Sequence, residues 1–233
     1  MRLAALETAT AVTAIAVGED DDVVERVVDD ARRHVEVLVP ALGEALGARG
    51  WGVSTLDAVV VDVGPGLFTG LRVGVATARA LALSAGVGLV ATTSTDALAE
   101  AARDRGLRGD VAAVVDVRRG EVAWAAYRLS DDGAVAVSSP ALARPDALAA
   151  GLSSHGPRPV AVGDGAWRYR DVLAASHVDV VDDLAVPSPG AALRLARRRL
   201  SSGEAALAHD ALHPLYLREA DATVNFAVRG TTP

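Results

Sequence analysis

The chain has 233 residues, enough for one large domain or two lobes with a substantial buried core. Hydrophobic residues make up 51% of it and aromatic residues only 3%, so the core must consist mainly of Ala, Val and Leu. The net charge of −7, with no basic tract of the kind that binds nucleic acid, argues against a chain that is itself the main nucleic-acid binder. The absence of cysteine excludes disulfides, thiolate nucleophiles and cysteine metal sites.

The sequence contains no signal for a membrane or for export. No apolar run approaches the roughly 18 residues that are needed to span a bilayer. At the N-terminus, Glu7 appears before any signal-like apolar segment develops. We therefore expect a soluble, cytoplasmic protein without membrane association.

The first part of the chain alternates β-branched segments with short polar turns, which is typical of a β-meander. We expect strands at residues 3–6, 12–17 and 23–28. A helix is predicted over residues 34–46, because apolar side chains recur there at helical spacing. Its apolar face is wider than a core alone requires. The stripe consists of Val35, Leu38, Val39, Leu42 and Leu46.

Two residues at the start of this helix, His34 and Glu36, are considered as metal ligands. A lone histidine beside a helix start is more often a cap or a surface residue, and no second histidine follows at metal-ligand spacing. We therefore expect neither a metal nor a cofactor in this chain.

The most informative stretch is residues 59–75, with the sequence VVVDVGPGLFTGLRVGV. Its nearly continuous valines predict a strand that is covered on both faces. A Gly-Pro-Gly turn then ends the strand, since proline fixes its own φ and glycine can adopt a positive φ. Thr69 is the expected N-cap of a helix over residues 70–85.

Small residues recur every four positions on that helix and form one stripe, where another backbone can come close. They are Gly70, Gly74, Ala78 and Ala82. Three interpretations stay open: a tight turn with a well-packed helix, a docking face for a second helix, and an anion site at the glycine-rich turn. A P-loop is excluded because its motif requires a lysine, and the sequence contains none.

The second half of the chain repeats the pattern of the first. Residues 106–110 are the best candidate boundary, and beyond them strands at 112–117 and 121–127 enclose a tight turn, as in the first meander. Glu7 and Asp116 fall at matching positions in the two halves. We therefore predict an internal duplication, with lobes at residues 1–108 and 109–233.

Four arginines gather on the last long predicted helix. They are Arg194, Arg197, Arg198 and Arg199. A helix C-terminus favours positive charge, which explains most of this cluster, and RNA contact is the alternative.

Five segments of the chain resemble motifs of one family, in the order in which that family has them. GPGLFTGLRVG at residues 64–74 is similar to the most characteristic motif of the bacterial TsaB family, also called YeaZ. ALETAT, RRHVEVLVPAL, VDVRRGEVAWAAY and PLYLR resemble its other motifs. The family belongs to the actin, Hsp70 and sugar-kinase superfamily. The motif residues are Gly64, Pro65, Gly66, Phe68, Thr69, Gly70 and Arg72.

This resemblance implies an α/β protein with a duplicated, two-lobed, actin-like (ribonuclease H-like) fold, each lobe a mixed sheet flanked by helices. It implies a non-catalytic subunit of the complex that forms N6-threonylcarbamoyladenosine at position 37 of tRNAs reading ANN codons. The implied partners are a TsaD-type subunit that transfers the threonylcarbamoyl group, a TsaE-type ATPase and, through the complex, tRNA. Alone, such a protein is expected to form a homodimer through the face that binds TsaD.

The resemblance also implies which residues meet the partner, and these lie on the two helices with unusual apolar or small faces. They are Val35, Leu38, Val39, Leu42, Gly70, Leu71, Gly74, Val75, Ala78 and Ala82. The alternative function is an ATP-dependent enzyme of the same superfamily, an ATPase or kinase. That alternative requires nucleotide near Glu7, Asp116, Gly163 and Gly165. Glu7 stands where the family usually has Asp, and the longer side chain would misplace the carboxylate.

Overall fold

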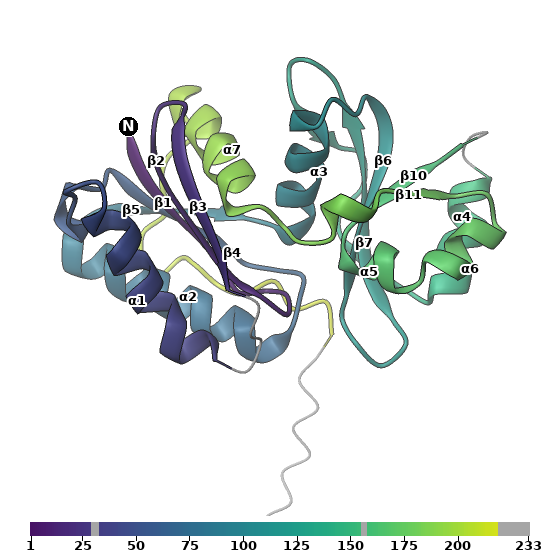
Figure 1. Ribbon diagram of the computed structural model, residues 1–233, viewed down its shortest axis with the longest axis horizontal. Helices are drawn as coiled ribbons and strands as arrows, with labels where there is room; N and C mark the ends of the chain where they lie inside the picture. The colour runs from purple at the N-terminus through teal and green to yellow at the C-terminus, as the bar shows by residue number, and fades with distance from the viewer. Residues whose placement is uncertain (29–32, 155–157, 219–233) are drawn as a thin grey trace, which may run out of the picture.

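The computed structural model describes residues 1–28, 33–154 and 158–218 as two lobes, each built on its own β-sheet (Figure 1). Within these residues, no helix combines the length and the apolar character that are needed to cross a membrane.

The first lobe holds a five-stranded mixed sheet with the order β3-β2-β1-β4-β5. β1 pairs antiparallel with β2 and parallel with β4. Every residue of β4 is buried, as its valine run predicts, whereas β3 forms the sheet edge and is mostly exposed. The strands are β1 (Arg2–Glu7), β2 (Thr13–Glu19), β3 (Asp22–Val28), β4 (Ala58–Asp62) and β5 (Gly88–Thr92).

One face of this sheet is covered by helices α1 (His34–Gly47) and α2 (Phe68–Ala85), which lie side by side in Figure 1. A short 3₁₀ helix, η1 (Val53–Thr55), connects α1 to β4. α1 begins at His34, as predicted, and therefore contains Pro40 in its interior.

The second lobe holds a six-stranded mixed sheet with the order β11-β10-β6-β7-β8, and β9 also pairs with β7. The strands are β6 (Gly109–Asp116), β7 (Val122–Leu129), β8 (Ala134–Ala136), β9 (Ala141–Ala143), β10 (Val160–Val162) and β11 (Asp179–Val180). The outer face is covered by α4 (Pro145–Ser153), α5 (Asp164–Arg168) and α6 (Arg170–Ala175), and η2 (Asp182–Leu184) follows β11. α5 and α6 are two short helices that meet at Tyr169.

The two sheets repeat one topology, which confirms the predicted duplicated α/β fold. β6 corresponds to β1 because each pairs antiparallel with the next strand and parallel with the strand that follows a helix. The second parallel pairing, β4 with β5, has its counterpart in β10 with β11. The sheets divide at Gly109, where β6 begins.

Two helices are exchanged between the lobes. α3 (Ser94–Asp104) comes before the second sheet in sequence but packs against it, while α7 (Pro189–Ser201) returns to cover the free face of the first sheet. The two helices pack against each other between the sheets (Figure 1). The lobes are therefore not two consecutive segments, and the division at 108/109 stays a prediction that applies to the strands alone.

Candidate functional site

The Gly-Pro-Gly turn connects the buried strand β4 to α2, and its glycines are required by packing within the first lobe. A Cβ atom on Gly66 would overlap the carbonyl group of Ala9, and one on Gly70 would overlap the carbonyl of Thr8. A Cβ on Gly74 would overlap the Thr8 hydroxyl. The small residues therefore let α2 lie directly on the turn between β1 and β2, which agrees with the interpretation of a tight turn and a well-packed helix.

The expectation that the small-residue stripe of α2 faces a partner is corrected by this packing. All six predicted interface residues on α2 are buried in the lobe's own interior, where they contact β4 and the β1–β2 turn. These residues are Gly70, Leu71, Gly74, Val75, Ala78 and Ala82. Leu38 and Leu42 of α1 are likewise buried in the core.

Thr69 is not the N-cap that the sequence led us to expect. α2 begins two residues earlier than predicted, at Phe68, with Leu67 as N-cap and without a side-chain capping bond. The Leu67 N–H donates to the carbonyl oxygen of Ala9 at 2.6 Å, which fixes the entry to the helix from the β1–β2 turn.

The outer faces of the same two helices do carry exposed apolar side chains. Val35 and Val39 of α1 are 73% and 52% exposed, and Leu83 of α2 is 64% exposed. Gly43 follows Val39 on the same stripe of α1, and no atom lies within 4 Å of the position of a Cβ there. This surface, Val35, Val39, Gly43 and Leu83, is called the helix face below.

Glu7, at the end of β1, is fully buried and does not open into a cleft. Its Oε1 atom accepts hydrogen bonds from the N–H groups of Ala9 and Thr10, at 2.8 and 3.2 Å. Burial, followed by the repulsion and bonding of the neighbouring Asp62 carboxyl group, raises the pKa of Glu7 well above its ordinary value. The residue is therefore a structural carboxyl group that holds the β1–β2 turn.

Asp62, at the end of the parallel strand β4, was not recognised as part of this group. Its Oδ1 atom accepts from the Gly64 N–H at 2.7 Å and from the Ser94 hydroxyl at 2.9 Å. Burial raises the pKa of the Asp62 carboxyl group. The sequence does carry a signal for this pairing, because Asp62 ends the valine run of β4. β1 and β4 are neighbouring parallel strands, so Glu7 and Asp62 at their ends lie at the same edge of the sheet.

His34 is buried at the start of α1, with its Nδ1 atom 2.7 Å from the Thr13 hydroxyl. In the described part of the chain, no group of three or more potential metal ligands comes together. His34 therefore connects α1 to β2.

Asp116 takes the place in the second lobe that Glu7 takes in the first, and it is enclosed by ion pairs. Arg118 contacts its Oδ2 atom at 3.0 Å and Arg168 at 3.5 Å. Its N–H donates to Asp164 at 2.9 Å, and burial raises the pKa of Asp164 to about 6.

The glycines proposed for a nucleotide are occupied by the chain's own atoms. A Cβ on Gly163 would overlap the carbonyl oxygen of Val114, and one on Gly165 would crowd the backbone of Val115 and Asp116. Both glycines therefore serve the packing of α5 on β6. None of Glu7, Asp116, Gly163 and Gly165 lines either of the two cavities that are recorded for the described part of the chain.

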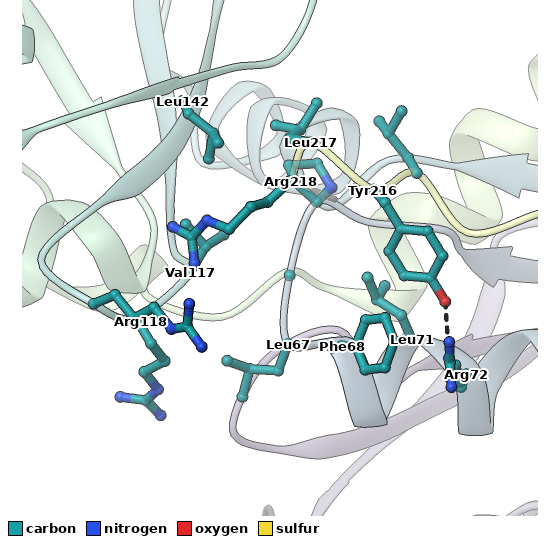
Figure 2. Close-up of a pocket in the computed structure, with 14 residues that line it drawn as sticks. Leu67, Phe68, Leu71, Arg72, Val117, Arg118, Leu142, Tyr216, Leu217 and Arg218 are labelled. Carbon is teal, nitrogen blue, oxygen red and sulfur yellow. Dashed lines mark hydrogen bonds between the residues drawn. The ribbon is translucent and has the colours of Figure 1, made fainter. Parts of the chain in front are cut away.

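A cleft of about 570 Å³ lies between the lobes at a different place (Figure 2). One wall is the Gly-Pro-Gly turn and the start of α2, the second is the turn between β6 and β7, and the third is the C-terminal segment. The residues that line it are Pro65, Gly66, Leu67, Phe68, Leu71, Arg72, Val117, Arg118, Arg119, Leu142 and residues 215–218.

The C-terminal segment that forms this wall, residues 204–218, is called the strap, and it was not predicted. Leu207 forms an antiparallel bridge with Leu89 of β5, and Leu212 is buried in the first-lobe core. The Leu215 N–H donates to the Val63 carbonyl oxygen at 2.7 Å. The Arg218 guanidinium then forms an ion pair with Glu121 of the second lobe.

The aromatic end of the strap lies on the family motif. Tyr216 packs on Phe68 with ring centroids 5.1 Å apart, and its hydroxyl accepts a hydrogen bond of 3.1 Å from Arg72 Nε. The same guanidinium lies 3.8 Å from the centre of the Phe68 ring. Arg72 therefore joins the motif helix to the strap.

The arginines of α7 are all used in ion pairs, which favours the interpretation that does not involve RNA. Each of the four contacts an acidic residue of the first lobe or of α3. The pairs are Arg194 with Asp104, Arg197 with Asp21, Arg198 with Glu100 and Arg199 with Asp96.

Comparison with known proteins agrees with these features. A family model described as "TsaD: tRNA N6-adenosine threonylcarbamoyltransferase" matches residues 28–226. The Escherichia coli protein named "tRNA threonylcarbamoyladenosine biosynthesis protein TsaB" is 27% identical over 94% of this chain and 95% of its own length. The crystal structure described as YeaZ from Pseudomonas aeruginosa matches with a TM-score of 0.82 and 26% identity, over 93% of this chain and 99% of that one.

The chain belongs to the TsaB (YeaZ) branch of this family.

Other relatives of this TsaB-family chain are longer than the region they share with it. Uncharacterized proteins of Mycobacterium leprae and Mycobacterium bovis are both 45% identical, over 60% and 53% of this chain. The matched regions make up 38% and 57% of those two proteins. The chain thus spans less than two thirds of the length of these curated relatives.

Proposed function

We propose that the chain is a non-catalytic subunit of the machinery that forms N6-threonylcarbamoyladenosine in tRNA. The observation that carries the proposal is its match, over nearly the whole of both chains, to the E. coli protein named for the biosynthesis of this nucleoside. The finer parts of the proposal, the modification of position 37 in tRNAs that read ANN codons and contact with tRNA through the complex, follow from membership of the TsaB family.

The proposed role is to bind and support a TsaD-type subunit. The family model that matches this chain describes the transferase itself, which supports a common fold for the two partners. We assign the contact to the helix face, where Val35 and Val39 are exposed on α1 and Leu83 is exposed on α2. Association would remove these apolar side chains from water, and the same face serves a homodimer when the partner is absent. A TsaE-type ATPase would join the pair.

A non-catalytic role is supported by the environment of the superfamily's catalytic positions. Glu7 is buried under the β1–β2 turn, and Asp116 is paired with two arginines. Neither carboxylate is available to hold a metal-bound phosphate without rearrangement of its lobe. An ATP-dependent enzyme is therefore the weaker alternative.

The test is reconstitution with the TsaD-type and TsaE-type proteins of the same organism. We expect a one-to-one complex of this chain with the TsaD-type protein by size-exclusion chromatography with light scattering. Formation of the modified nucleoside in tRNA should require this chain, and the variant Glu7→Gln should support it fully. Modification at the full rate without this chain would overturn the proposal, and loss of activity in a folded Glu7→Gln variant would favour the enzyme.

A further inference from the structure

One edge of the second sheet lacks the protection that the other sheet edges have. An open edge presents unpaired backbone groups to which another strand can add, and proteins usually cover such an edge, shorten it or place charges on it. β3 carries Asp22, Glu25 and Arg26, the strap bridges β5 at Leu207, and β11 is only two residues long. In the described part of the chain β8 ends the second sheet without a further strand, and residues 134–139, AVAVSS, carry no charge.

The outer face of this edge is apolar and uncovered. Val135 and Val137 are 63% and 62% exposed. Val135 pairs with Arg128 and therefore lies on the face of β7 that also carries Trp124, and Val137 lies on the same face because the side-chain period of a strand is two. The core under α4 and α6 includes Trp124 but neither valine. Another segment is needed to remove these two side chains from water.

The backbone of this edge can accept a strand at Ala136. The Val137 N–H donates to the Ala126 carbonyl oxygen of β7 at 2.7 Å, so Val137 bonds towards the sheet. Neighbouring residues of a strand direct their backbone groups to opposite sides, and Ala136 therefore directs its N–H and carbonyl groups away from β7. The Ala134 N–H agrees with this alternation, because it donates to Glu100 of α3 at 3.3 Å.

The described chain ends beside β7, the strand that pairs with β8. Arg218, the last described residue, forms an ion pair with Glu121, which directly precedes β7. Residues 219–233 lie outside the described part of the chain. Val224 follows Arg218 by as many residues as Tyr127 follows Glu121. Because extended chains advance equally per residue, a chain that runs along this edge from Arg218 brings Val224 level with Tyr127, which pairs with β8.

The sequence after Arg218 contains a pattern that matches the edge. Residues 223–228 read TVNFAV, in which every second residue is large and apolar. A period of two with β-branched and aromatic residues is typical of a strand with one apolar face. Val224, Phe226 and Val228 therefore form the kind of surface that the two exposed valines of the edge require.

We propose that residues 223–228 add to the open edge of β8 as an antiparallel strand. Their apolar side chains then lie on the outer face and cover Val135 and Val137. The end of the chain would join the second sheet much as the strap joins the first at Leu207. This contact lies in the second lobe and the helix face lies in the first, so the proposal is independent of the proposed function.

The test is backbone hydrogen exchange, measured by NMR on the full chain and on a chain that ends at Arg218. We expect the Ala136 N–H to exchange at least roughly tenfold faster in the shortened chain, because its hydrogen-bond partner is lost. The Val137 N–H is the internal control, since its bond to Ala126 lies within the sheet and remains. Equal exchange of the Ala136 N–H in the two folded chains would overturn the proposal.

A single substitution separates strand pairing from a general effect of the shortened chain. Phe226→Ser removes the largest apolar side chain of the pattern and should reproduce the fast exchange of the Ala136 N–H. Thr231→Ser, which lies outside the pattern, is the matched control and should keep the slow exchange. Circular dichroism establishes that each variant is folded. Slow exchange in folded Phe226→Ser would show that the pattern does not cover this edge.

Mixing distinguishes pairing within one chain from pairing between two copies. An isotope-labelled chain that ends at Arg218 is mixed with the unlabelled full chain, and the Ala136 N–H of the labelled chain should stay fast. Recovery of slow exchange in this mixture would mean that the segment binds a second copy, and the proposal would then be wrong.

Discussion

The Thr8 hydroxyl donates a hydrogen bond of 2.7 Å to the carbonyl oxygen of Gly70, and this contact joins the β1–β2 turn to the first turn of α2. It brings the two backbones so close that the helix has no room for a side chain at Gly70 or Gly74. Gly70 and Gly74 of the family motif are thus part of the interior of the first lobe.

The variant Gly74→Ala is expected to destabilise the chain. Alanine favours a helix by up to about 1 kcal/mol, but its Cβ would overlap the Thr8 hydroxyl and force the helix outward, at a cost of roughly 1–3 kcal/mol. Gly43→Ala is the matched control, because this glycine also lies inside a helix and has nothing near it. It should stabilise the chain by about 0.5–1 kcal/mol in urea unfolding at low protein concentration. Equal stabilisation by both variants would contradict the packing.

The buried Glu7 makes stability depend on pH. Its pKa in the folded chain lies above the ordinary value of 4.5, so the folded state retains a proton that the unfolded state releases above this pH. The free energy of unfolding therefore falls as the pH rises above 4.5. Glu7→Gln keeps an oxygen acceptor for the Ala9 N–H and brings an N–H₂ group towards Asp62, without the charge.

We expect Glu7→Gln to gain stability relative to the unaltered chain between pH 5 and pH 8, measured by urea unfolding at each pH. The exposed Glu204 is the control, and Glu204→Gln should show no such trend. A constant difference between Glu7→Gln and the unaltered chain over this range would show that Glu7 is charged throughout.

The helix face can be tested by a single charge. Val39→Arg places a cation at the centre of the exposed stripe of α1 and should weaken association with the TsaD-type protein roughly a hundredfold, because the charge would be buried without a partner. Its unfolding midpoint should be unchanged, since Val39 is half exposed. Val135→Arg, at an exposed valine of β8 in the other lobe, should bind normally. Normal binding by Val39→Arg would remove the helix face from the interface.

The strap should contribute to the stability of the first lobe. Leu212 is buried in the same core as Leu38 and Leu42 of α1, so Leu212→Ala should cost about 2–4 kcal/mol in urea unfolding. Leu207→Ala is the control, because its side chain is partly exposed and its contact with Leu89 runs through the backbone. It should cost less than about 1 kcal/mol. A similar small loss in both variants would mean that the strap is only loosely attached.

The parts of the fold that follow from local pattern were predictable. The valine run of β4, the Gly-Pro-Gly turn and the repeated meander each place strongly patterned residues next to turn signals, and the structure has them at those positions. The start of α2 was misplaced by two residues because a backbone contact, from the Leu67 N–H to Ala9, begins the helix before the threonine that resembles a cap.

The candidate site was less predictable, because it depends on contacts between distant segments. A stripe of small residues shows that another backbone comes close, but it does not show whose, and here it is the chain's own Thr8. The strap has no helical or strand period, so its position across β5 and the motif helix has no local signal. Arg118 and Arg119 lie in a hairpin turn, and the local sequence does not indicate that the strap forms a cleft with this turn.

The exchange of α3 and α7 has a consequence for the order in which the chain can fold. One face of the first sheet, which includes Leu3, Ala5 and Val60, is covered by Leu193 and its neighbours on α7. During synthesis this face stays uncovered until α7, which ends at Ser201, has left the ribosome. Such distant contacts slow folding and leave apolar surface open to a chaperone or to another chain. A fragment that ends at residue 108 would lack α7 and leave this surface open, and a fragment that begins at residue 109 would lack α3. Each half of the duplication therefore supplies part of the cover for the sheet of the other.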